Sequence, residues 1–105
     1  MEKKFLNLEN ISIYIASFEL SNYIWGIVIQ WSFFEKDTVG KQLVKSIDSI
    51  SANIAEGFGS QSNPEFKRFL NYARRSVSEV QSCLYLAVDR KFVNLVLSVI
   101  SVGSV

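Results

Sequence analysis

The chain has 105 residues, a formal net charge of +1, one cysteine and no histidine. A chain of this length forms one domain, so we expect residues 1–105 to fold as a unit. The absence of histidine excludes Ser-His-Asp and Cys-His catalysis and every imidazole metal site, and a single cysteine excludes an internal disulfide. We therefore expect no catalytic residues, no metal, no cofactor and no enzymatic activity.

Apolar residues make up 49 % of the chain and aromatic residues 13 %, which is high for a small soluble protein. A chain this short buries only about two-thirds of its unfolded surface, so the apolar surplus predicts a second buried surface, most simply a subunit interface. The uncharged run from Leu20 to Phe34 is shorter than the roughly 20 residues that a membrane-spanning helix needs. We expect no membrane segment, and the single cysteine favours a reducing, cytoplasmic location.

The first helix is predicted from about Leu8 to Ser32, because large residues recur there at spacings of three and four. Two sets follow this spacing. One comprises Ile11, Ile15, Phe18, Asn22, Trp25 and Ile29, and the other comprises Ile13, Leu20, Ile24, Ile27 and Trp31. Two apolar faces predict a helix that is buried nearly all round, inside a bundle or partly against another subunit.

A second helix is predicted after the charged stretch at residues 35–38, with Asp37 or Thr38 as its N-cap. One stripe of this helix is apolar and comprises Leu43, Ile47, Ile50, Ile54 and Phe58. Gly57 and Gly59 are expected to supply left-handed positions that end the helix.

The third helix begins with a capping box at residues 62–65, with Pro64 in the first turn. Residues 89–91 end it. Its apolar stripe runs in steps of three and four through Phe66, Leu70, Ala73, Val77, Val80, Leu84 and Ala87. A short fourth helix is predicted within residues 92–100. The expected fold is therefore all-α, an antiparallel up-down four-helix bundle with a short fourth helix. The alternative is a three-helix unit whose apolar tail docks on a neighbouring chain.

Positive charge is concentrated late in the chain, since residues 67–91 carry a net +4 while residues 1–35 carry a net −2. Two pairs of cations in the third helix are spaced seven apart, and two lysines are four apart in the second. An oligomer would repeat such a face by symmetry and add phosphate contacts, which suits RNA or DNA. An ordinary solvated helix face is the competing interpretation. The candidate nucleic-acid-binding residues are Lys41, Lys45, Lys67, Arg68, Arg74 and Arg75.

A polar stripe also runs along the second helix, through Gln42, Ser46, Ser49, Asn53 and Glu56. Ser76 and Glu79 lie close in register on the third helix. One interpretation is a carboxylate site in which Glu56 and Glu79 meet, although di-iron bundles use Glu-x-x-His pairs. The favoured interpretation is a set of buried or interfacial polar residues that satisfy backbone groups and fix register. Cys83 is predicted to be a buried structural thiol.

The run Asp48-Ser49-Ile50-Ser51-Ala52-Asn53-Ile54-Ala55-Glu56-Gly57-Phe58-Gly59 resembles the family of 23S ribosomal RNA intervening-sequence proteins. Residues 38–43, 65–70 and 73–79 support the resemblance, which covers about residues 5–93. The motif positions here are Asn53, Glu56, Gly57, Gly59, Ser76 and Glu79. The resemblance implies an antiparallel four-helix bundle, often a homopentamer, of largely unassigned biochemical function. Gly59-Ser60 stands where many members have Gly-Arg, and Arg75 stands where they have glycine.

A relative in that family, the accessory variability determinant of diversity-generating retroelements, binds nucleic acid and a reverse transcriptase through a basic pentamer surface. The first functional hypothesis is therefore a non-enzymatic, homo-oligomeric helical bundle, a scaffold that contacts RNA or DNA through the basic face of the third helix. The second is an accessory subunit that binds a protein partner and makes no nucleic-acid contact.

Overall fold

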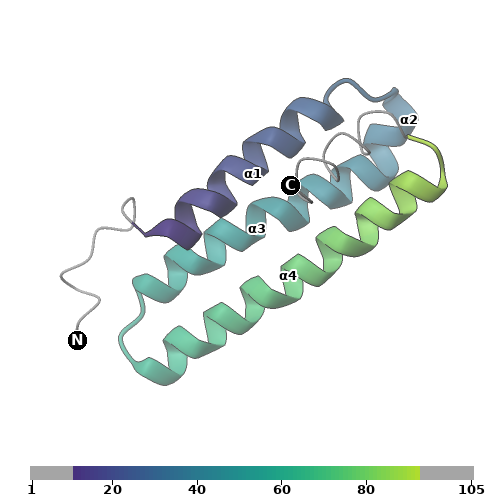
Figure 1. Ribbon diagram of the computed structural model, residues 1–105. Coiled ribbons are helices and arrows are strands. Elements are labelled where there is room, and N and C mark those ends of the chain that lie inside the picture. The colour runs from purple at the N-terminus through teal and green to yellow at the C-terminus, as the bar shows by residue number, and fades with distance from the viewer. Residues whose placement is uncertain (1–10, 93–105) are drawn as a thin grey trace.

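A computed structural model of the protein describes residues 11–92, and every long element in that range is an α-helix (Figure 1). The long helices are α1 (Ser12–Val28), α3 (Lys41–Phe58) and α4 (Asn63–Asp89). A short turn, α2 (Phe33–Glu35), and a π-helical turn, η3 (Lys36–Gly40), lead directly into α3. The all-α prediction is confirmed. The four-helix bundle is not, because three long helices lie in the described range and the predicted fourth helix falls almost wholly outside it.

The middle helix α3 holds the fold together (Figure 1). It packs lengthwise against both α1 and α4, which run antiparallel to it, whereas α1 and α4 scarcely touch each other. The apolar stripe predicted for α3 is confirmed, since Leu43, Ile47, Ile50 and Ile54 are buried. Phe58 is partly buried against the same core.

The stripe predicted for α4 is only partly buried. Ala73, Val80 and Ala87 are in the core, and Cys83 joins them, but Leu70 and Val77 are about 40 % exposed. The reason is geometric, because α4 has one long neighbour, α3, and a single neighbour cannot cover a broad apolar stripe.

Helix α1 is not buried all round within the single chain. Small residues, Ser17 and Ser21, lie on its inner face, and the Ser21 hydroxyl donates a hydrogen bond of 3.1 Å to the Ile47 carbonyl of α3. The second predicted set is buried only in its C-terminal half, at Ile24, Ile27 and Trp31. We call the exposed apolar members of the first set the outer ridge of α1; they are Ile15, Phe18, Trp25 and Ile29.

The second helix begins earlier than predicted, at a capping box formed by Ser32 and Glu35. The Glu35 backbone N–H donates to Ser32 Oγ (3.2 Å), and the Ser32 N–H donates to Glu35 Oε1 (3.0 Å). The prediction that Asp37 or Thr38 caps this helix is wrong, because both lie inside the π-helical turn. Thr38 instead donates its hydroxyl to the Phe34 carbonyl (2.8 Å).

The end of α3 also differs from its prediction. Gly59 has φ −85°, and no glycine in residues 11–92 has a positive φ, so the left-handed role expected of Gly57 and Gly59 is wrong. By contrast, the Ser62 cap is confirmed, since Ser62 Oγ accepts from the Glu65 N–H at 3.3 Å. Pro64 lies in the first turn of α4 as predicted.

The corner between α1 and α3 requires glycine at position 40. A Cβ on Gly40 would lie 2.8 Å from Val28 Cγ1 and 3.1 Å from the Glu35 carbonyl oxygen. Both distances are below ordinary van der Waals separation, and one of the two atoms is backbone. The absence of a side chain therefore lets the π-helical turn pack directly against the end of α1.

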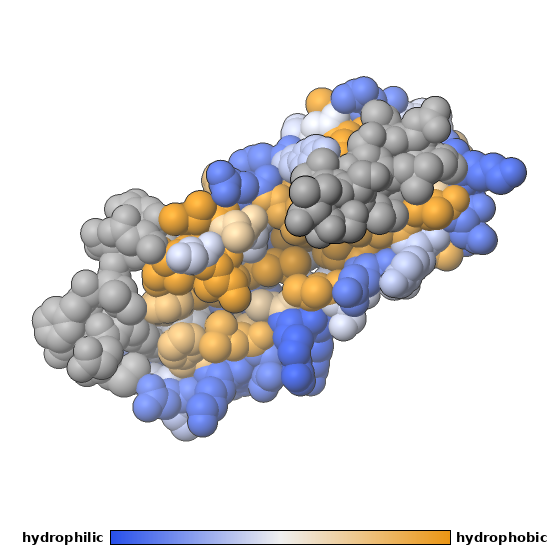
Figure 2. All heavy atoms as spheres, viewed as in Figure 1, coloured by the Kyte–Doolittle hydropathy of each residue, from blue (hydrophilic) through white to orange (hydrophobic). Residues whose placement is uncertain are grey.

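One face of the described chain is rich in apolar side chains. Figure 2 shows them gathered between α1 and α4, with hydrophilic side chains along the outer borders. This distribution follows from the fold, because α3 forms the floor of a trough whose two walls do not meet.

We predict that Gly40→Ala destabilises the protein by about 1–3 kcal/mol, because the added methyl group overpacks the corner. The measurement is urea unfolding followed by circular dichroism. Gly59→Ala is the matched control, since its backbone is right-handed and its Cβ would have ordinary contacts of 3.6 and 3.7 Å. Equal losses of stability in the two variants would contradict the role assigned to Gly40.

Candidate functional site

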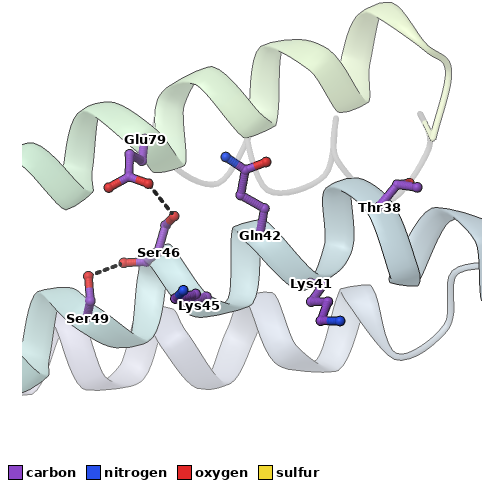
Figure 3. A pocket seen from close by; sticks show the side chains of 7 residues that line it. All are labelled: Thr38, Lys41, Gln42, Lys45, Ser46, Ser49 and Glu79. Carbon is purple, nitrogen blue, oxygen red and sulfur yellow. Dashed lines mark hydrogen bonds between the residues drawn. The ribbon is translucent and has the colours of Figure 1, made fainter.

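The first three residues of the polar stripe predicted on α3, Gln42, Ser46 and Ser49, line a groove between α3 and α4 (Figure 3). The groove has a volume of about 460 Å³ and is partly open to solvent. Gln42 extends from α3 toward α4, whereas Lys41 points away from α4 (Figure 3). The lining residues are Thr38, Lys41, Gln42, Lys45, Ser46, Ser49 and Glu79.

Serine hydroxyls connect the two helices at the floor of the groove. Ser49 and Ser76 are hydrogen-bonded to each other across the interface. The Ser49 hydroxyl also contacts the Ser46 carbonyl (3.0 Å), and the Ser76 hydroxyl contacts the Tyr72 carbonyl (3.2 Å). Two hydroxyl protons thus serve three contacts, so at any moment one serine donates across the interface while the other donates to its own helix. This network fixes the register of α3 against α4.

The carboxylate interpretation of the polar stripe is wrong. Glu79 Oε2 accepts a hydrogen bond from Ser46 Oγ at 3.4 Å. Glu56 follows Ser46 by ten residues on the same helix, which corresponds to about 15 Å along the axis, so Glu56 and Glu79 do not meet. Both are exposed, and residues 11–92 hold no cluster of three metal-ligating side chains. Asn53 has a local role, because its amide donates to the Ser49 carbonyl at 2.8 Å.

Cys83 is buried, as predicted, and only 2 % of it is exposed. Burial raises the pKa of its thiol, and the nearby negative charge of Glu79 raises it further. Both effects favour the neutral thiol over the thiolate, which is the nucleophilic form. Cys83 therefore packs as a small apolar side chain in the core.

The six predicted nucleic-acid-binding residues are exposed but do not form one patch. Lys41 and Lys45 border the groove on α3, and Lys41 lies 4.0 Å from Asp37. The other four are in the N-terminal half of α4, where Arg68 lies 3.7 Å from Glu65. Because Ser49 contacts Ser76, only Lys45 on α3 lies within about two turns of Arg75 along the interface.

The sequence reasoning missed the aromatic side chains among these cations. The Arg68 guanidinium lies over the Phe69 ring, and the Arg75 guanidinium lies over the Tyr72 ring. A signal was present for one pair, because Tyr72 and Arg75 are three residues apart, and that spacing brings helical side chains together. Arg68 and Phe69 are adjacent in sequence, a spacing that gives no such signal.

None of the helices in the described part of the chain combines the length and apolar character needed to cross a bilayer. Fold and site together define a small all-helical protein with a hydroxyl-lined groove and a basic helix. A family model for the 23S rRNA-intervening sequence protein matches residues 9–97, so the chain belongs to this family, as the resemblance predicted. Searches of curated proteins and of solved structures return no match.

We predict that Ser76→Ala lowers the free energy of unfolding by about 1 kcal/mol, because it removes the hydrogen bond between α3 and α4. Thermal unfolding measures the change. Ser82→Ala, on an exposed position of the same helix, controls for the general effect of replacing serine by alanine in a helix. If Ser82→Ala costs as much stability as Ser76→Ala, the serine network does not fix the register.

Proposed function

We propose that this protein is a non-enzymatic scaffold that self-associates through α1 and presents the basic face of α4 to RNA or DNA. The observation that carries the proposal is the separation of two surfaces on one small chain. An apolar ridge lies on the first long helix, and a group of exposed cations lies on the last. Since α1 and α4 flank α3 and scarcely touch, contacts at one surface leave the other accessible.

The outer ridge of α1 supports self-association. Phe18 and Trp25 are each more than half exposed, and Ile15 and Ile29 are about 40–50 % exposed. Monomeric proteins rarely leave several large apolar side chains exposed on one face of a helix, because covering them stabilises an assembly. A homo-oligomer is the simplest way to cover the same ridge on every chain, and the family resemblance favours five subunits.

The complete subunit is proposed to be a four-helix bundle. The apolar trough between α1 and α4 has two walls and a floor but no covering helix among the described residues. An apolar helix within residues 92–100 suits this position by composition. A cytoplasmic location also remains part of the proposal, on the evidence of the single cysteine.

The basic face supports nucleic-acid contact. Lys67, Arg68, Arg74 and Arg75 are all exposed on the same half of α4. One chain has a net charge of only +1, so a monomer would bind phosphates weakly. A closed oligomer repeats the face, and affinity for a polyanion rises with the number of phosphates contacted.

A second candidate function is a protein-binding accessory subunit without nucleic-acid contact. The observation in its favour is the pair Phe33 and Phe34 at the corner after α1, which are 80 % and 75 % exposed. These rings lie close in sequence to the outer ridge, so a different protein could cover both. The two functions differ in whether the purified chain assembles on its own.

We predict that the purified protein is a closed oligomer. Trp25→Glu should reduce the mass of the assembly, because a carboxylate at the subunit interface would be desolvated. Light scattering over a range of concentrations measures the mass. Tyr85→Glu is the control, since Tyr85 is 73 % exposed on α4, away from the outer ridge. A wild-type chain that stays monomeric at every concentration contradicts self-association and favours the accessory-subunit function.

We also predict salt-dependent binding to RNA or DNA, measured by filter binding between about 50 and 200 mM salt. The double variant Lys67→Glu, Arg74→Glu should bind at least about tenfold more weakly at low salt and show a shallower salt dependence. Arg90→Glu makes the same kind of charge change at the far end of α4 and should have less effect. No salt-dependent binding by the wild-type protein at micromolar concentration would refute this part of the proposal.

A further inference from the structure

Four residues of α4, joined by three ring contacts, form a surface feature that we call the aromatic clamp: Arg68, Phe69, Tyr72 and Arg75. The centroids of the Phe69 and Tyr72 rings are 5.7 Å apart, and the ring planes are nearly perpendicular at 87°. The Arg68 guanidinium carbon lies 5.4 Å from the Phe69 centroid, and that of Arg75 lies 5.7 Å from the Tyr72 centroid. Two arginines thus flank a pair of aromatic rings on one stretch of helix.

The fold holds the clamp from below. Gly57, near the end of α3, has no side chain, and a Cβ there would lie 3.4 Å from Phe69 Cβ. Phe69 therefore packs closely on α3 and is half-buried, whereas Tyr72 is 38 % exposed. On the other side, Ser76 ties the adjacent turn of α4 to Ser49 of α3. The rings are thus anchored to a helix pair rather than to a loop.

The charge on the clamp is positive. Arg68 lies near Glu65, but this exposed pair neutralises little because solvent screens it. Arg75 has no ion pair with any residue in the range 11–92. Guanidinium groups bind phosphate oxygens through paired N–H donors, and their flat faces stack on bases and rings.

The two rings and two arginines of the clamp favour single-stranded over double-stranded nucleic acid. Unpaired bases expose their flat faces, which stack on aromatic rings and on guanidinium planes. In a duplex those faces are covered by neighbouring base pairs, and only the phosphates remain for the arginines. A basic helix without exposed rings would have no such reason to prefer one state over the other.

We infer that the aromatic clamp binds the unpaired bases and phosphates of single-stranded RNA or DNA in preference to a duplex. This inference rests on the nucleic-acid contact proposed above. It assigns the stacking surface to Tyr72 with the edge of Phe69, and the phosphate and stacking contacts to Arg75 and Arg68. Lys67 and Arg74, which lack such ring contacts among the described interactions, add general electrostatic attraction.

The test measures the affinity of the full chain, by fluorescence anisotropy, for labelled oligouridylate and oligothymidylate of about 12 nucleotides. A duplex of the same length is the comparison probe. We expect the single strands to bind at least about fivefold more tightly than the duplex. A preference for uridylate over thymidylate would indicate RNA as the source of the single strand, and equal affinity would indicate recognition by stacking and charge alone.

Variants then separate stacking from charge. Tyr72→Ala should weaken single-strand binding by about five- to tenfold and leave duplex binding nearly unchanged. Tyr72→Leu keeps the apolar packing but has no ring, and it should weaken single-strand binding to a similar extent. This second variant tests the role of the ring even if Tyr72→Ala fails to fold. Arg75→Lys keeps the charge and the salt dependence but loses the flat stacking surface, and we expect about threefold weaker single-strand binding. Tyr85→Ala removes an exposed ring outside the clamp and should have no effect.

Two results overturn the inference and remain distinguishable from failure of the proposed function. Equal wild-type affinity for duplex and single strand, or unchanged single-strand binding by Tyr72→Leu, would show nucleic-acid binding without the clamp. No binding to any of the three probes at low salt would instead overturn the proposed nucleic-acid function itself.

Discussion

The packing of α1 and α4 on either side of α3 is the constraint on which the other features depend. Helix α3 supplies a fully apolar stripe, with Ile47 and Ile54 almost completely buried, and each neighbour covers part of it. Because α1 and α4 scarcely touch, each keeps apolar surface that the described chain does not cover. The outer ridge of α1 and the trough between α1 and α4 both follow from this arrangement. The proposed assembly and the proposed fourth helix are the two ways in which these surfaces become buried.

Close approach to α3 depends on small groups at the two interfaces. On the α1 side, Gly40 lets the π-helical turn meet Val28, and Ser21 hydrogen-bonds a carbonyl of α3. On the α4 side, Ser49 and Ser76 make the contact, and Gly57 admits Phe69. These polar and small residues set the distance and register at which α4 presents its arginines and rings.

The features that the sequence predicted correctly are those that depend on residues near one another in the chain. The stripe from Leu43 to Ile54 and the Ser62 cap were predictable, because helical spacing and capping depend on local geometry. The inner face of the N-terminal half of α1 was not, because it is lined by Ser17 and Ser21, while Ile15 and Phe18 face outward. The Ser32 cap was missed since Phe33 and Phe34 resemble a continuation of the apolar helix before them. In the site, the sequence predicted that the polar stripe fixes register but not that Ser49 pairs with Ser76. The contact of Arg68 with Phe69 depends on rotamers that spacing does not determine.

The central claim is that the outer ridge of α1 is covered by another copy of the chain. The two tryptophans test it directly, because Trp25 is 54 % exposed on that ridge while Trp31 is buried in the core beside Phe92. The measurement is collisional quenching of fluorescence over a dilution series, with Trp31→Phe to isolate Trp25 and Trp25→Phe to isolate Trp31. The account predicts that Trp25 is protected at high concentration and becomes quenchable on dilution, while Trp31 stays protected throughout. Quenching of Trp25 that is strong and independent of concentration would contradict it.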